Sequence, residues 1–419
     1  MERTSGNIRI LLVDDDPLVL KIYKDGLSRL GLQVETASDG LAAVQSLRAA
    51  RPDLVVLDMM MPKFSGLDTI KIIRSQTPLA GLPIIMLSNS YMNDMASEAV
   101  AAGVQKALLK VRCTPTLLAS IIQDVVAGRE SPENVAVTLA MPKPQSAKPI
   151  APPPASAAAT APAGPAPAPV PTAANAAEFM AKSREDFLAK PSEMLAALRG
   201  LEQAVSRSAT AAERSQRLEV FYRKVHFLSA TAGLAECHLI ARMACAFEAL
   251  LFELMEKPAF FGPSVLLTIA RTVDFFGVLF QRALESDSII PLATAEGLVV
   301  DDDPLSNRVV VAALRRAEVK AQSIEDPLAA LQLLAKRPCD LILLDIEMPG
   351  LDGFELCRRV RLLPGHQKTP VIYVTAHADF DSRARSVLTG GNELISKPVF
   401  PIELAVKAVT HMLKAQLAQ

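Results

Sequence analysis

The chain has 419 residues, 44 basic and 45 acidic side chains and a formal net charge of −1, which predicts about three domains of roughly 150 residues and excludes a global attraction to nucleic acid or anionic lipid. Its N-terminus has no apolar run and its longest uncharged stretch, 149–177, is broken by prolines, so we expect a cytoplasmic protein without a signal peptide or membrane insertion. The five cysteines are scattered without a CxxC pair, which favours reduced thiols packed like small apolar groups.

In residues 8–127, short apolar runs alternate with segments of helical period. Runs that are apolar on both faces fit the buried strands of a parallel sheet, and the segments between them fit helices that cover the sheet on each side. This region is therefore predicted to be an α/β domain. The strand-like runs are Ile8–Val13, Leu54–Leu57, Ile84–Leu87 and Ala107–Leu109, and the helical segments include Leu18–Leu30 and Leu41–Ala49.

A stretch rich in proline and alanine lies at 141–175, with almost no large apolar side chain between 141 and 172. Such a composition cannot form a hydrophobic core and predicts a semi-extended linker. At about 3.1 Å per residue in a polyproline conformation, this linker would reach at most ~100 Å.

Residues 176–286 carry aliphatic and Phe side chains at spacings of three and four, which predicts an antiparallel helical bundle. Thr210 and Glu213 fit a capping box at the start of the segment that holds His226. A short connection, 287–296, leads to the next region, so we expect the two regions to be closely coupled. Helix breaks are expected at Pro191, Gly233, Pro258 and Pro263.

Residues 295–413 repeat the pattern of the first α/β region, with polar positions in register 287 residues apart. Because the apolar residues between these positions change while the polar ones are kept, the shared feature is a polar site. The strand-like runs of this second copy are Gly297–Val300, Leu341–Leu344, Val371–Val374 and Glu393–Ile395. The paired positions are Asp14/Asp301, Asp15/Asp302, Asp16/Asp303, Pro17/Pro304, Asp58/Asp345, Met61/Met348, Pro62/Pro349, Ser88/Thr375 and Lys110/Lys397.

The polar residues of each copy are expected to meet at one edge of the sheet. Asp14 and Asp15 follow the first strand, Asp58 the third, Ser88 the fourth and Lys110 the fifth, and ligands gather at the carboxyl ends of the strands in sheets of this kind. Crowded carboxylates predict a hard divalent cation such as Mg²⁺. The lysine and the hydroxyl could hold the oxygens of a phosphoryl group.

Both copies resemble receiver domains of two-component response regulators, over roughly 3–128 and 295–413. The resemblance implies flavodoxin-like, doubly wound, five-stranded parallel sheets, with Asp58 and Asp345 accepting a phosphoryl group from phosphohistidine. The acceptor-to-hydroxyl spacing of 30 and the hydroxyl-to-lysine spacing of 22 recur in both copies, which makes the resemblance specific. It implies metal ligation by Asp14, Asp15, Asp58, Asp301, Asp302, Asp345 and the carbonyls of Met60 and Glu347, and phosphoryl contacts from Ser88, Thr375, Lys110 and Lys397.

The two copies depart from the family pattern near the lysine. The second keeps a Lys-Pro step at Lys397, whereas the first has Lys110-Val111. The position three residues before the lysine is usually aromatic in this family, but it is Ala107 or Leu394 here. We therefore expect an output by altered docking rather than by an aromatic switch.

His226 is followed by the small residues Ser229, Ala230, Ala232 and Gly233 on one side of its predicted helix. Together with the bundle and the flanking receivers, this pattern resembles a histidine phosphotransfer domain over 176–286. Small neighbours would leave the imidazole open to a docking protein, and a neutral ring nitrogen is a competent phosphoryl acceptor. The family's Lys-Gly is Ser229-Ala230 here. The alternative is a partly buried histidine, as expected for His238, and no role is assigned to His366, His377 or His411.

The leading hypothesis is a cytoplasmic phosphorelay protein that exchanges a phosphoryl group among Asp58, His226 and Asp345. No ATP-binding kinase core is recognised, so any activity is phosphoacceptance or self-phosphotransfer. The expected partners are a sensor histidine kinase or other phosphodonor and a downstream signalling protein, without nucleic acid and with a homodimer left open. The alternative is a phosphorylation-gated interaction or dimerisation scaffold whose bundle carries no phosphate.

Two further classes are disfavoured. An aspartyl phosphatase generally needs a second carboxylate two residues after its nucleophile, and Met60 and Glu347 do not preserve one in both copies. A transcription factor would need a basic helix-turn-helix segment, and none remains after the three domains are assigned.

Overall fold

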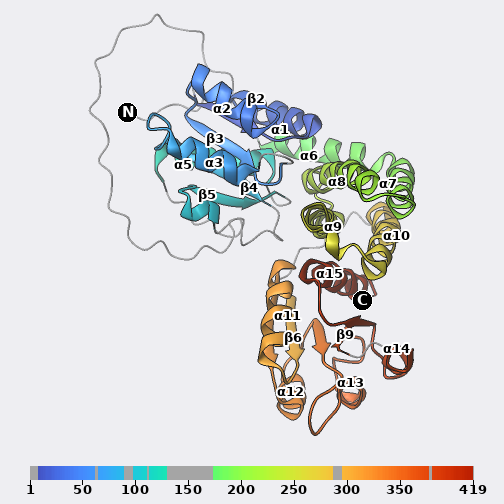
Figure 1. Ribbon diagram of the computed structural model, residues 1–419. Coiled ribbons are helices and arrows are strands. Elements are labelled where there is room, and N and C mark those ends of the chain that lie inside the picture. Colours follow the sequence, from blue (N-terminus) through green and yellow to red (C-terminus); the bar gives the residue numbers. More distant parts are fainter. Residues whose placement is uncertain are drawn as a thin grey trace, which may run out of the picture. The chain divides into compact units, whose positions relative to one another are not determined.

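The computed structural model describes residues 8–61, 65–88, 98–110, 113–129, 173–285, 295–376 and 380–418. They belong to two compact units, one containing the first copy and the other containing most of the helical stretch with the second copy (Figure 1). Residues 141–172 of the expected linker, together with Pro62, Val111 and His377, lie outside the described residues.

The first copy is a five-stranded parallel sheet with the strand order β2-β1-β3-β4-β5. This doubly wound order confirms the predicted fold. Every residue of β3 and β4 is buried, as expected for central strands covered on both faces. The strands are β1 (Arg9–Val13), β2 (Gln33–Ala37), β3 (Leu54–Asp58), β4 (Ile84–Ser88) and β5 (Lys106–Leu109). The described helices include α1 (Pro17–Arg29), α2 (Gly40–Ala49), α3 (Gly66–Ser75) and α5 (Pro115–Ala127).

The second copy repeats this topology, with the order β10-β9-β8-β6-β7 and all pairs parallel. Its core on one face of the sheet gathers around the tilted rings of Phe354 and Tyr373, whose centroids lie 5.1 Å apart. The strands are β6 (Ala295–Val300), β7 (Val319–Ile324), β8 (Leu341–Leu344), β9 (Val371–Thr375) and β10 (Glu393–Ser396). The helices are α11 (Pro304–Arg316), α12 (Pro327–Leu334), α13 (Gly353–Leu362), α14 (Phe380–Leu388) and α15 (Pro401–Leu417).

The central stretch forms the expected helical bundle. Helix α7 packs against α8 and α10, and α9 packs against the same two helices, which closes a four-helix arrangement. Thr210 caps α8 by accepting a hydrogen bond from the Glu213 backbone N–H at 3.1 Å, whereas the Glu213 carboxylate accepts from the Ala209 N–H rather than from that of Thr210. The helices are α6 (Ala173–Leu188), α7 (Pro191–Ser206), α8 (Ala211–Leu234), α9 (His238–Glu256) and α10 (Pro263–Glu285), with a short 3₁₀ helix at Pro258–Phe260.

Helix α10 is long and apolar enough to cross a membrane by length and composition, and half of its apolar window is buried within the protein. Its buried residues include Val265, Ile269, Phe276 and Phe280, and the helix packs on α7, α9 and α15. The apolar composition of α10 is thus matched by packing against its neighbours. The five cysteines are free thiols, four of them buried.

The bundle and the second copy form a single compact unit from residue 180 onward. Helix α15 contacts both α9 and α10 of the bundle, and Arg316 at the end of α11 pairs with Glu253 of α9. The expected close coupling of these two regions is confirmed.

Candidate functional site

The sheet of the first copy brings the predicted acidic residues together. Val13 of β1 pairs with Leu57 of β3, so the residues that follow, Asp14 and Asp58, lie side by side at the carboxyl edge. Ser88 pairs with Leu109, which places Lys110 at the same edge. Four segments far apart in the sequence therefore contribute to one rim, as expected for this topology.

Lys110 is bonded to the carboxylates of this rim. Its Nζ lies 2.8 Å from Asp14 Oδ2 and 3.2 Å from Asp58 Oδ2. The Asp16 backbone N–H donates to Asp14 Oδ1 at 3.0 Å and fixes the orientation of that carboxylate. The rim thus holds one cation against several negative charges.

The second copy reproduces the arrangement. Lys397 Nζ lies 2.7 Å from both Asp301 Oδ2 and Asp345 Oδ2, and the Asp303 N–H donates to Asp301 Oδ1 at 3.0 Å. The Ile346 N–H donates to Asp345 Oδ1 at 2.6 Å. The two oxygens of Asp345 are therefore held by different groups, one by the backbone and one by the lysine.

One contact at the second rim has no counterpart in the first. The Ser306 hydroxyl donates to Asp301 Oδ2 at 2.6 Å, while the position 287 residues earlier is Val19. Ser306 is not shared by the two copies, so the repeat pattern could not point to it.

Burial and charge shift the titration of the second rim. Burial raises the pKa of the Asp345 carboxyl, although the hydrogen bond and charge of Lys397 oppose this shift. Burial would lower the pKa of Lys397, but hydrogen bonds to Asp301 and Asp345 outweigh it and raise that pKa. Lys397 is consequently a permanent cation beside Asp345 at neutral pH.

The donor set of each rim fits a hard divalent cation. One carboxylate oxygen from each of Asp14, Asp15 and Asp58 lies within 4.8 Å of the others. The corresponding carboxylate oxygens of the second copy also lie within 4.8 Å of one another. Three carboxylates beside one lysine leave an excess of negative charge, and oxygen donors are what Mg²⁺ prefers. The second triad is Asp301, Asp302 and Asp345.

The remaining predicted rim residues lie where the topology requires. Ser88 ends β4 and Thr375 ends β9, and the Lys397 backbone N–H donates to the Thr375 carbonyl at 2.7 Å. Met60 lies two residues after Asp58, and Glu347 lies two residues after Asp345. Ligation of a metal by their carbonyls and phosphoryl binding by the hydroxyls stay predictions.

A glycine at the start of the helix after Asp58, and another after Asp345, was not singled out from the sequence. A Cβ on Gly66 would lie 2.4 Å from the Asp58 carbonyl oxygen, and one on Gly353 would lie 2.0 Å from the Asp345 carbonyl oxygen. Each helix therefore begins directly against the peptide of Asp58 or Asp345, and only glycine fits there. The two glycines are also 287 residues apart, so the repeat contained the signal.

In the bundle, His226 is held by a carboxylate from the neighbouring helix. Its Nδ1 lies 2.8 Å from Glu248 Oε1, and Glu248 Oε2 accepts a hydrogen bond from the Ser229 hydroxyl at 2.6 Å. This bond engages Nδ1, so phosphoryl chemistry on the ring would fall to Nε2. Glu248 could not be predicted from the sequence, because a glutamate within α9 has no local pattern that points to α8.

His366 and His411 both bond to neighbouring groups of the second receiver. His366 Nε2 lies 3.0 Å from the Leu334 carbonyl and its Nδ1 lies 3.2 Å from the Thr369 hydroxyl, so the ring joins segments of the fold. His411 pairs with Glu393 at 2.8 Å. The access expected at His226 from its small neighbours stays a prediction. Helix α8 passes through Gly233 and ends at Leu234, one residue after the expected break.

Comparison with known families gives two matches to one family model. Residues 10–122 and 298–409 match the model described as "Response regulator receiver domain", and the two matches together span more than half of the chain. Both contain the complete acidic rims described above.

Several curated proteins are similar over one region. The probable transcriptional regulatory protein TcrX of Mycobacterium tuberculosis is 40% identical over 89 residues, 21% of this chain and 37% of its own length. The response regulator MprA of Mycobacterium bovis is 38% identical over 138 residues, 32% and 57% of the two chains. The cyclic di-GMP phosphodiesterase response regulator RpfG of Xanthomonas campestris is 35% identical over 113 residues, which are 26% of this chain and 30% of its own length. The chain thus spans between about a third and three-fifths of these relatives' lengths.

Solved structures also match one region at a time. The chemotaxis protein CheY4 of Vibrio cholerae is 30% identical, with 28% of this chain and 98% of that chain covered and a TM-score of 0.27. The receiver domain of the sensor histidine kinase PA1611 of Pseudomonas aeruginosa, described with a magnesium ion coordinated in its active site cleft, is 28% identical, with coverage of 28% and 98% and a TM-score of 0.26.

Proposed function

The chain belongs to the response regulator receiver domain family, and from this premise we propose that it is a phosphorelay protein of two-component signalling. In this proposal Asp58 and Asp345 accept phosphoryl groups and His226 exchanges them. The observation that carries it is the paired rim: in each copy one lysine ammonium touches both the acceptor and a neighbouring aspartate.

Each rim supplies the groups that phosphoryl transfer to a carboxylate needs. An Asp345 oxygen attacks phosphorus as the bond from phosphorus to the donor's nitrogen breaks, and the donor imidazole departs with that electron pair. Lys397, already 2.7 Å from the acceptor, bonds to the oxygens of the arriving group, and the Thr375 hydroxyl accompanies it. A magnesium ion, when bound by the three carboxylates, would neutralise further negative charge on the phosphoryl oxygens.

His226 is proposed as the exchanging histidine because its ring is oriented by a buried carboxylate. The Nδ1 proton donated to Glu248 leaves the lone pair of the neutral ring on Nε2, the nitrogen that attacks phosphorus. Once Nε2 is phosphorylated the ring is cationic, and the Glu248 carboxylate beside Nδ1 stabilises that charge. The Ser229 hydroxyl fixes the second oxygen of Glu248 and so holds the carboxylate in place.

The proposed partners follow from this chemistry. A sensor histidine kinase or other phosphodonor supplies the phosphoryl group, and a downstream signalling protein reads the state of the receivers. We place this exchange in the cytoplasm, without nucleic acid or membrane insertion, and leave homodimerisation open.

A bundle that served as an interaction or dimerisation surface is expected to expose Phe side chains. Phe260 is the most exposed Phe among the described bundle residues, at 45%, and its ring stacks on Phe400 of the second receiver at 4.3 Å. This side chain is thus already part of an internal contact.

The test separates phosphate by chemical lability, because acyl phosphates are lost in base and phosphohistidine is lost in acid. Wild-type chain and His226→Gln are labelled through a phosphorylated donor in the presence of Mg²⁺. A base-stable label that disappears in His226→Gln supports the proposal. A wild-type chain with no base-stable label removes His226 from the relay.

A further inference from the structure

Helix α15 of the second receiver is buried on all sides. Every residue from 402 to 410 is buried, including the charged side chains of Glu403 and Lys407. The equivalent helix of the first receiver, α5, buries one face, and the positions that match Glu403 and Lys407 are the exposed Thr116 and Ser120. One side of α15 covers its own receiver, so the other side must be covered by the bundle.

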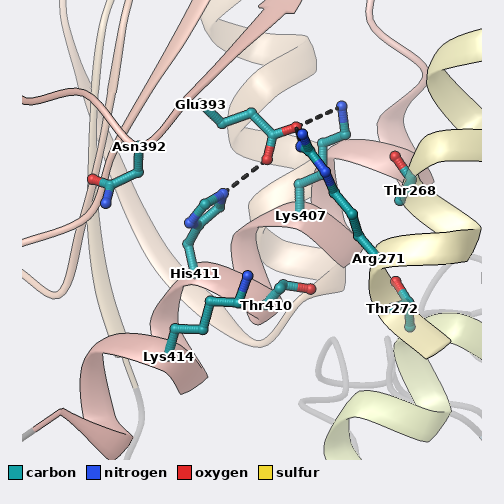
Figure 2. Close-up of a pocket in the computed structure, with 9 residues that line it drawn as sticks. All are labelled: Thr268, Arg271, Thr272, Asn392, Glu393, Lys407, Thr410, His411 and Lys414. Atoms are coloured by element: carbon teal, nitrogen blue, oxygen red, sulfur yellow. Dashed lines mark hydrogen bonds and ion pairs between the residues drawn. The ribbon is translucent and has the colours of Figure 1, made fainter. Parts of the chain in front are cut away.

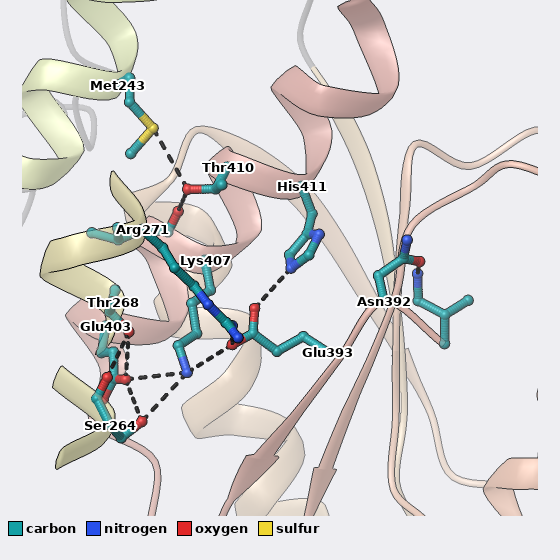
Figure 3. A network of polar contacts seen from close by, with 12 residues as sticks. Met243, Ser264, Thr268, Arg271, Asn392, Glu393, Glu403, Lys407, Thr410 and His411 are labelled. Carbon is teal, nitrogen blue, oxygen red and sulfur yellow. Dashed lines mark hydrogen bonds and ion pairs between the residues drawn. The ribbon is translucent and has the colours of Figure 1, made fainter. Parts of the chain in front are cut away.

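A polar network joins α15 to α10 of the bundle (Figure 3). Glu403 Oε1 accepts hydrogen bonds from the hydroxyls of Ser264 at 2.6 Å and Thr268 at 2.9 Å. Lys407 Nζ lies 3.2 Å from Glu403 and 3.1 Å from Glu393 of β10. The buried Glu403 carboxylate and the part-buried Glu393 carboxylate therefore share one buried ammonium, and separating the domains would expose or unpair all three.

Thr268, Glu393 and Lys407 of this network also line a cavity of about 210 Å³ between α10, α15 and β10 (Figure 2). Arg271 from α10 reaches Glu393 at 3.4 Å, and His411 from α15 reaches the other oxygen of Glu393 at 2.8 Å. Glu393 is thus bonded from the bundle and from its own receiver. Hydrogen bonds across this cavity extend the interface from α15 to the edge strand.

Contacts continue along the whole interface. Arg316 pairs with Glu253 at 2.5 Å, and Arg242 donates to the Ala317 carbonyl at 3.2 Å. The Thr410 hydroxyl lies 3.6 Å from Met243 Sδ. The interface therefore engages α9 near both of its ends, which fixes the orientation of the second receiver.

Helix α9 presents opposite faces to the second receiver and to His226. Met243 and Glu253 contact the receiver, whereas Glu248 contacts His226 on α8. Glu248 is five residues from each of them, which places it about 140° around the helix from both. Helix α9 accordingly lies between α8 and α15, as Figure 1 also shows.

This geometry separates the two reacting groups. In-line transfer needs the attacking nitrogen within about 3–3.5 Å of phosphorus, whereas a helix with its side chains is about 10–12 Å across. The Asp345 rim is fixed to one side of α9, and the ring of His226 is bonded to the other side. Exchange between them would require the buried polar network to open.

We infer that, within one chain, His226 exchanges its phosphoryl group with Asp58 and not with Asp345, whose receiver is a fixed partner of the bundle. The inference rests on the proposed function of His226. In the transfer, the bond from an Asp58 oxygen to phosphorus breaks as the Nε2–phosphorus bond forms. The Asp58 carboxylate keeps the electron pair, and the Nδ1 proton stays on the ring against Glu248.

The experiment measures base-stable label on the full chain. Wild type, Asp58→Asn, Asp345→Asn and His226→Gln are incubated with radiolabelled acetyl phosphate and Mg²⁺, and base-stable and base-labile label are counted separately. Base-labile label on the remaining receiver shows that each single aspartate variant is folded. Repeating the reaction at a tenfold lower protein concentration separates transfer within a chain from transfer between chains.

We expect Asp345→Asn to keep wild-type base-stable label within twofold and Asp58→Asn to lose at least tenfold, with a rate per chain unchanged by dilution. Loss of label in Asp345→Asn, retention in Asp58→Asn, or a rate that falls on dilution overturns the inference while leaving the relay role of His226 intact. A wild-type chain without base-stable label removes that role, and the inference fails with it.

Discussion

Adding a single methyl group at Gly353 should slow phosphorylation of Asp345 while the chain still folds. A Cβ at this position would lie 2.0 Å from the Asp345 carbonyl oxygen and 2.9 Å from its carbonyl carbon. Both are backbone atoms, so no side-chain rotation relieves the clash. Gly353→Ala must therefore move either the start of α13 or the acceptor peptide itself.

The magnitude follows from that distance. Reaching even a tight contact requires a displacement of about 1 Å, and overpacking of this kind typically costs about 1–3 kcal/mol of unfolding free energy. A 1 Å misplacement of a reacting group lowers rates by about a hundredfold. For Gly66→Ala the corresponding oxygen lies at 2.4 Å, so a smaller loss at Asp58 is expected.

The assay is the initial rate of Mg²⁺-dependent labelling of Asp345 in an Asp58→Asn background, together with the urea midpoint. Gly262→Ala serves as the control, because a Cβ there meets nothing within 4 Å. We expect Gly353→Ala to slow labelling by one to two orders of magnitude, on the scale of such misplacements, and the control to label normally. Wild-type labelling of a folded Gly353→Ala chain would refute the reasoning.

Three other predictions concern charge and metal. Burial would raise the pKa of Glu393, but His411 and Lys407 outweigh it and lower that pKa to about 2. The ionised Glu393 carboxylate therefore stabilises the fold above about pH 4.5, and up to about 3 kcal/mol of unfolding free energy is lost as the pH falls toward 2. The urea midpoint of Glu393→Gln should fall less than that of the wild type over this pH range, and an identical fall would contradict the prediction. Glu248→Gln should slow base-stable labelling about tenfold, as removal of an orienting partner does, with acyl phosphate label unchanged; an unchanged rate contradicts the orienting role. Chelation of Mg²⁺ by EDTA should abolish labelling of both receivers, and persistent labelling would contradict the proposed ligand set.

The buried strands and the rims could be predicted from the sequence because both leave local signals. Strands such as Leu54–Asp58 are apolar on both faces, and the acidic landmarks recur in register. The bounds of the edge strands β2 and β7 could not be predicted, because Gln33–Ala37 and Val319–Ile324 each bury only one residue and carry polar residues at their exposed positions. A one-sided strand gives a weaker signal than a central one.

Contacts between elements were beyond the sequence. Glu248 meets His226 only because α8 and α9 pack in one particular rotation, and Glu403 and Lys407 of α15 read as ordinary solvent-facing charges until the bundle covers them. Their burial depends on tertiary packing, and the residue pattern of a single helix does not show which neighbour will cover it. Gly66 and Gly353 could have been predicted from the sequence, since they have the same repeat spacing as the aspartates.

The most direct test of the two-acceptor account is peptide mapping of acyl phosphate after incubation with Mg²⁺ and a small phosphodonor. Wild type should carry label on the peptides that contain Asp58 and Asp345, each single Asn variant should retain only the other label, and the double variant should carry none. Full base-labile labelling of the double variant would contradict the assignment of these two aspartates.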